Sequence, residues 1–139
     1  MTRINVVPVE ELSDQHLIRE YQELPRCIKQ NINTDDAPLV YKLGTGHMKW
    51  AKKHSFFLVD RYFELCGEMI YRGFKVNYPA SSLQKCALKT VIYNNENSYK
   101  PTNEDLQTNS QRLIEKYKMK PDWYRWTKRE KPNYMEDIK

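Results

Sequence analysis

Apolar side chains recur at helical spacing between residues 15 and 32, and this pattern constrains the fold more than any other feature of the chain. Pro25 lies within the pattern, and we expect it to kink the helix without ending it because the apolar stripe continues beyond it. Ser13 is suited to cap the first turn, and Asp14 suits the positive end of the helix dipole. At about 100° of rotation per residue, the apolar face comprises Leu17, Ile18, Tyr21, Leu24, Ile28 and Ile32.

The opposite face of the same helix is polar, and we expect it to lie away from the core. Glu23 is the carboxylate best placed for chemistry, because Arg19 and Arg26 lie one turn to either side of it. An ordinary salt bridge between side chains four residues apart, at about 0.2–0.5 kcal/mol, explains the same pattern and is favoured from the residues alone. The polar face comprises His16, Arg19, Glu20, Glu23, Arg26 and Gln30.

A second, longer helix is predicted from His47 to Arg72, with Gly73 as its C-cap. Trp50 and Phe57 lie off its apolar stripe, so we expect this helix to be covered on more than one side. The stripe itself comprises Met48, Ala51, Leu58, Val59, Tyr62, Cys66, Met69 and Ile70.

A third helix is predicted from Thr102 to about Lys120, because Thr102 and Asp105 resemble a capping box and Pro121 ends the pattern. Its inward residues are expected to be Leu106, Leu113, Ile114 and Tyr117. Residues 2–12 are expected to be extended, and residues 74–101 to be irregular.

The length of 139 residues supports one hydrophobic core and one domain, residues 1–139. Apolar residues make up 40% of the chain and aromatic residues 12%, which argues against disorder. The predicted fold class is therefore all-α, a compact single domain of about three helices with an N-terminal arm and long irregular loops.

The formal net charge of +5 favours a polyanionic partner, such as DNA bound by non-specific electrostatics. The three cysteines, Cys27, Cys66 and Cys86, form no CxxC pair, and the three histidines lack metal-ligand spacing. We therefore expect no disulfide, no metal and no cofactor. The start of the chain is too short and polar for a signal peptide, and no apolar run spans a membrane, so an intracellular protein without a membrane partner is expected.

The segment from Lys116 to Lys131 carries seven basic residues and two acids, interleaved with Trp123, Tyr124 and Trp126. Basic side chains neutralise phosphates, and planar rings give unpaired bases a stacking surface. This combination favours nucleic acid over an acidic protein. The alternative is that the rings pack the tail onto the helices while the charges are solvated.

The N-terminal amine is a candidate nucleophile, because an α-amine titrates near pH 7.7–8.0 and is partly unprotonated at neutral pH. A neighbouring cation such as Arg3 would increase that fraction. Thr2 is small, so we expect Met1 to be removed and Thr2 to carry the free amine. From the residues alone this chemistry is only permitted, since every chain has an N-terminus.

The first 26 residues, MTRINVVPVEELSDQHLIREYQELPR, resemble the start of the pyrimidine dimer DNA glycosylases, the endonuclease V family of T-even phages. The resemblance continues at LGTGHMKW, at RGFKV and at SQRLIEKYKMKPDWYRW, and it covers about half of the chain. It implies a compact, mainly helical domain in which an N-terminal arm threads between helices.

The resemblance also implies an activity. It suggests excision of UV-induced cyclobutane pyrimidine dimers from duplex DNA, followed by β-elimination through a Schiff base. Thr2 matches the nucleophile and Glu23 the essential acid, while Tyr21 matches a position near the pocket or in the core. The DNA-contacting positions by resemblance are Arg3, Gln15, His16, Gln22, Arg26, Arg112, Lys116, Trp123, Tyr124, Arg125 and Trp126. No metal is implied, and we expect a monomer in the cytoplasm of a phage-infected bacterial cell.

Two residues depart from the family pattern. Gln22 stands where the family has an arginine, so one phosphate contact is expected to be lost, and Thr127 stands where a further aromatic residue is expected. Two alternatives stay open: the same chemistry on another damaged or modified base, and a non-catalytic DNA-binding protein that uses the same basic face.

Overall fold

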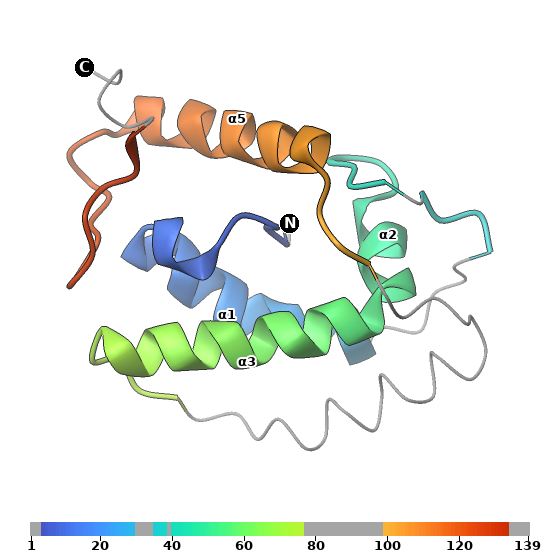
Figure 1. Ribbon diagram of the computed structural model, residues 1–139, viewed down its shortest axis with the longest axis horizontal. Helices are drawn as coiled ribbons and strands as arrows, with labels where there is room; N and C mark the ends of the chain where they lie inside the picture. The colour runs from blue at the N-terminus through green and yellow to red at the C-terminus, as the bar shows by residue number, and fades with distance from the viewer. Residues whose placement is uncertain (1–3, 30–34, 39, 77–98, 134–139) are drawn as a thin grey trace.

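The computed structural model describes residues 4–29, 35–38, 40–76 and 99–133 (Figure 1). Within these ranges the chain is helical and contains no β-strand, which confirms the all-α class. No helix in them is long and apolar enough to cross a membrane. The elements are the 3₁₀-helix η1 (Val9–Glu11) and the α-helices α1 (Asp14–Lys29), α2 (His47–Lys53), α3 (Ser55–Tyr71) and α5 (Asn103–Met119).

Helix α1 has the predicted start and the predicted apolar face. The backbone N–H of His16 donates to Ser13 Oγ at 3.2 Å, which is the expected N-cap bond. Leu17 and Leu24 are fully buried, and α1 continues through Pro25 to Lys29 as predicted. The side chain of Ile28, as well as Ile32, lies outside the described residues.

The single long helix predicted between residues 47 and 72 is wrong, because the chain leaves the helical conformation at His54 (φ −102°, ψ 49°) and forms α2 and α3. His54 is shared by the two helices: its N–H donates to the carbonyls of Trp50 and Ala51 at the end of α2, and its carbonyl accepts from Leu58 N–H at the start of α3. No proline or glycine stands between residues 50 and 58, so the sequence carries no local signal for the break.

The end of α3 is as predicted, and one member of its stripe is not. Gly73 has a φ of +89°, and Phe74 N–H donates to Met69 O in a Schellman motif, which a glycine at this position favours. Ile70, expected in the buried stripe, is 65% exposed. Helix α5 begins with the predicted capping box at Thr102 and Asp105 and ends at Met119.

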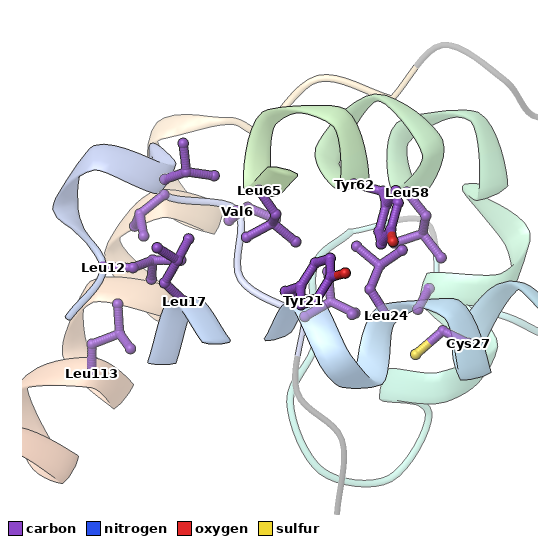
Figure 2. Packing of buried hydrophobic residues seen from close by; sticks show 14 of the residues in the cluster. Val6, Leu12, Leu17, Tyr21, Leu24, Cys27, Leu58, Tyr62, Leu65 and Leu113 are labelled. Atoms are coloured by element: carbon purple, nitrogen blue, oxygen red, sulfur yellow. The ribbon is translucent and has the colours of Figure 1, made fainter. Parts of the chain in front are cut away.

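The N-terminal arm, residues 4–8, lies between α5 and the layer formed by α1 and α3 (Figure 1). Helix α1 packs mainly on α3 and α2, whereas α5 reaches the other helices chiefly through this arm. Val6 of the arm lies beside Leu65 of α3, and Leu113 of α5 lies near Leu12 and Leu17 (Figure 2). The arm is thus part of the core.

Every backbone N–H from Ile4 to Val7 donates to a side chain. Since an extended segment with no neighbouring strand has no backbone partners, its buried peptide groups need such acceptors. The acceptors are His47 Nε2 for Ile4 (2.9 Å), Glu20 Oε1 for Asn5 (3.3 Å), and Asn109 Oδ1 for both Val6 (2.6 Å) and Val7 (3.0 Å).

Glu20 was predicted on the solvent side of α1, and that prediction is wrong, because Glu20 is only 2% exposed. Its carboxylate accepts from Arg61 Nε at 2.7 Å and from Asn5 Nδ2 at 2.7 Å. Arg61 also donates from Nη1 to the Val7 carbonyl. The physical reason is that the arm brings polar peptide groups into the core, and a buried ion pair on α1 and α3 binds them.

Replacing Arg61 with Met should lower the free energy of unfolding by about 3–5 kcal/mol, because Glu20 would stay buried without its counterion. Urea unfolding followed by circular dichroism measures this change. Lys49→Met is the matched control: its ion pair with Asp36 is exposed, so a change below about 1 kcal/mol is expected. Equal losses in the two variants would contradict the structural role of the buried pair.

Candidate active site

A cavity of about 270 Å³ opens between α1, α5 and the tail that follows α5. Helices α1 and α5 supply polar and charged side chains to it, and the tail supplies two aromatic rings. Asn5 of the arm and the buried Glu20 also reach the cavity. Seven residues predicted for the site line it together: Gln15, His16, Glu23, Arg112, Lys116, Trp123 and Tyr124.

His16 forms part of the aromatic wall of the cavity. Its ring stacks on Tyr124 (centroids 5.2 Å apart, planes at 8°) and meets Tyr117 edge-on at 5.1 Å. His16 Nδ1 lies 3.0 Å from Ser13 Oγ, which already accepts the His16 backbone N–H. The hydroxyl proton is therefore free for Nδ1, which favours the tautomer that carries its proton on Nε2.

Burial, and then the positive charges of Lys116 and Arg112, lower the pKa of His16 from its ordinary 6.5 to about 4. His16 is consequently neutral at physiological pH and offers a hydrogen bond rather than a charge. The basic residues that line the cavity are Arg19 of α1 and Arg112 and Lys116 of α5.

Glu23 is the acid of the cavity. Its side chain is 16% exposed, and Arg19 Nε lies 3.2 Å from Glu23 Oε1, so the salt bridge predicted as the simpler interpretation does exist. The same carboxylate lines the cavity opposite the basic residues of α5. Glu23 is therefore paired with Arg19 and lines the same cavity as Arg112 and Lys116 of α5.

Gln15 binds the tail of the chain. Gln15 Nε2 donates to the carbonyl of Trp123 at 2.7 Å, and Arg125 N–H donates to Gln15 Oε1 at 3.1 Å. Asp14 N–H adds a bond to the Arg125 carbonyl at 2.6 Å. The first turn of α1 thus fixes the backbone of the aromatic wall, and Gln15 has a positioning role in addition to its place in the cavity.

The two tryptophans of the tail lie in different environments. Trp123 is 55% exposed at the cavity, whereas Trp126 is 7% exposed in the core and donates from Nε1 to the Glu11 carbonyl at 2.9 Å. Trp126 therefore packs the tail onto the rest of the protein, as the alternative interpretation of this segment predicted.

Thr127, which departs from the family pattern, has a defined partner. Its backbone N–H donates to Asp14 Oδ1 at 3.0 Å, and its hydroxyl donates to Asp14 Oδ2 at 2.5 Å. Arg72 donates to the same carboxylate at 2.9 Å. The tail is therefore tied to the start of α1 and the end of α3 directly after Trp126.

Other predicted residues are not gathered in the cavity. Among the described residues, Gln22, Arg26 and Arg125 are exposed and do not line it. Thr2 and Arg3 lie outside the described residues. Within the described part, no group of three or more His, Cys, Asp or Glu side chains is arranged to hold a metal ion.

Several residues that shape this region were not identified from the sequence. The arm is held by Asn109, Glu20 and His47. Each of them lies in a helix, where a polar side chain is normally expected to face solvent. Asn109 carried a weak signal, since asparagine has a low helix propensity and stands in the middle of a predicted helix. Its side chain compensates by binding three groups of the arm.

A sequence model of the pyrimidine dimer DNA glycosylases matches residues 1–82. The match covers more than half of the 139 residues and includes the arm, α1, α2 and α3. The chain belongs to the pyrimidine dimer DNA glycosylase family. This family acts on DNA that contains pyrimidine dimers, and the wall formed by α5 and the tail lies beyond the matched range.

In this glycosylase, NMR titration of the His16 ring should give a pKa near 4. Lys116→Gln should raise this pKa because it removes a nearby like charge, whereas Lys118→Gln, an exposed base on the same helix, should leave it unchanged. Because the folded state disfavours the protonated ring, the free energy of unfolding should fall as the pH is lowered from about 6.5 to about 4. A His16 pKa of 6.5 or above would contradict the described environment.

Proposed function

We propose that this glycosylase excises cyclobutane pyrimidine dimers from duplex DNA and then cuts the strand as an abasic-site lyase. In this reaction the α-amine of Thr2, exposed after removal of Met1, attacks C1′ of the 5′ sugar of the dimer. The glycosidic bond breaks, and the base takes the bonding electrons but stays joined to the 3′ pyrimidine through the cyclobutane ring. The sugar ring opens as the amine and C1′ form a Schiff base. Loss of a proton from C2′ then breaks the C3′–O bond and cuts the strand.

One observation carries the proposal: Glu23 lies in a cavity that the N-terminal arm itself helps to form. Asn5 lines the cavity, and Thr2 precedes it by three residues. Since a chain spans at most about 3.3–3.6 Å per residue, the Thr2 amine lies within about 11 Å of Asn5. The amine and Glu23 can therefore act on the same sugar, with Glu23 supporting ring opening and proton transfer.

The remaining side chains of the cavity fit a DNA substrate. Arg112 and Lys116 on α5 supply the charge that binds phosphate. The exposed ring of Trp123 offers a stacking surface for an unpaired base, as expected for an enzyme that unstacks a nucleotide. Neutral His16 can donate a hydrogen bond without adding to that charge.

Borohydride trapping on a duplex with a single dimer tests the chemistry, because reduction of the Schiff base leaves protein and DNA covalently joined. Met1-free protein should form the adduct, and Glu23→Gln should keep DNA binding while strand cutting falls by at least about 100-fold. Glu64→Gln, at an exposed glutamate of α3, is the matched control and should cut at the normal rate.

Absence of an adduct with Met1-free protein would contradict the proposal, as would normal cutting by Glu23→Gln. Duplexes that carry other lesions test the alternative in which the same chemistry acts on another damaged or modified base. DNA binding without any adduct on such a panel would indicate a protein that only binds DNA.

Gln22 offers a separate test of DNA contact, since the family has an arginine at this position and Gln22 is exposed on α1. Gln22→Arg should tighten binding to undamaged duplex and steepen the slope of log K against log salt by about 0.9, the value for one phosphate contact. Gln107→Arg on the exposed side of α5 adds the same charge and should change the slope less. Equal slopes for the two variants would contradict a phosphate contact at residue 22.

A further inference from the structure

Both polar backbone groups of Ile4 are held by side chains from the segment that leads into α2. The N–H of Ile4 donates to His47 Nε2 at 2.9 Å, and its carbonyl accepts from the Tyr41 hydroxyl at 2.6 Å. Ile4 is itself fully buried. We propose that His47, supported by Tyr41, is a positioning residue that sets the location of the N-terminal amine, an inference that rests on the function proposed above.

The hydrogen bonds of His47 define its tautomer. Nδ1 lies 2.7 Å from the carbonyl oxygen of Lys42, which can only accept, so Nδ1 carries the proton. Nε2 then presents its lone pair to the Ile4 N–H. The neutral ring thus acts as a fixed acceptor between a backbone carbonyl and the arm.

Neighbouring rings restrict the movement of this acceptor. His47 is fully buried at the first position of α2 and stacks on Trp50 with centroids 5.8 Å apart. Tyr41 meets Trp50 edge-on at 4.9 Å, and its backbone N–H donates to Asp105 Oδ1 at 3.3 Å. The two anchors of Ile4 are therefore joined to α2 and to the start of α5.

The bonds to His47 and Tyr41 hold the nitrogen and the carbonyl oxygen of Ile4 in place. Two residues, Arg3 and Thr2, connect this nitrogen to the amine. The amine lies within about 7 Å of the Ile4 nitrogen, since two residues span no more than that. Loss of the anchor should therefore impair the covalent step and leave DNA affinity intact, because His47 is buried away from the cavity surface.

The experiment compares His47→Leu, which removes the acceptor, with His47→Gln, whose amide oxygen can replace Nε2. Single-turnover borohydride trapping at saturating dimer DNA should slow by at least about tenfold in His47→Leu, because small displacements of reacting groups are costly. The dissociation constant for the same DNA should stay unchanged, and His47→Gln should recover most of the rate.

Hydrogen exchange of the Ile4 amide gives a readout that does not depend on activity. Exchange should accelerate in His47→Leu and return toward the normal rate in His47→Gln. His54→Leu is the matched control, since His54 is also buried and packs against Trp50 and Tyr99. It should trap at the normal rate. If His47→Leu fails to fold, Tyr41→Phe removes a single hydroxyl from Ile4 and should slow trapping in the same step.

Three results would overturn the inference. The first is a normal trapping rate in His47→Leu although its Ile4 amide exchanges faster. The second is a trapping rate that falls equally in His54→Leu, and the third is a loss of DNA affinity in His47→Leu that accounts for its slower trapping. Normal trapping by Tyr41→Phe would overturn it where His47→Leu does not fold. These outcomes differ from failure of the proposed function, in which the unaltered, Met1-free protein forms no adduct at all.

Discussion

The buried backbone of the N-terminal arm is the constraint on which the rest of the structure depends. Four consecutive N–H groups enter the core without a partner strand, and each lost hydrogen bond would cost about 1–3 kcal/mol. Asn109 of α5, Glu20 of α1 and His47 of α2 supply the acceptors, and Arg61 of α3 neutralises Glu20. The arm therefore joins the four described α-helices through polar side chains.

The same arrangement brings the arm to the chemistry. Asn5 and Glu20 contact each other at the inner side of the cavity, so the element that binds the helices together also forms part of the candidate site. An N-terminal amine is normally mobile, because chain ends are poorly ordered unless they are tied down. Among the described residues, the arm is held from Ile4 onward, two residues after the proposed nucleophile.

The far side of the cavity depends on a second set of bonds. Asp14 and Gln15, in the first turn of α1, hold the backbone from Trp123 to Thr127, and buried Trp126 secures the tail to η1. Trp123 can then remain exposed on a fixed backbone. The backbone N–H and the hydroxyl of Thr127 both donate to Asp14, which ties the tail to the start of α1 directly after Trp126.

The sequence by itself determined the helical class, the start of α1 at Ser13, the capping box at Thr102 and the aromatic-basic character of the tail, because these signals are local and periodic. Its resemblance to the family pointed to seven of the residues that line the cavity. Only the tertiary structure decided that Glu20 is buried, that the helix breaks at His54, and that Trp123 and Trp126 have different environments. A helical pattern separates polar from apolar faces, but it does not show which polar side chains face a buried arm. That depends on contacts between residues up to about a hundred positions apart, such as Val6 with Asn109.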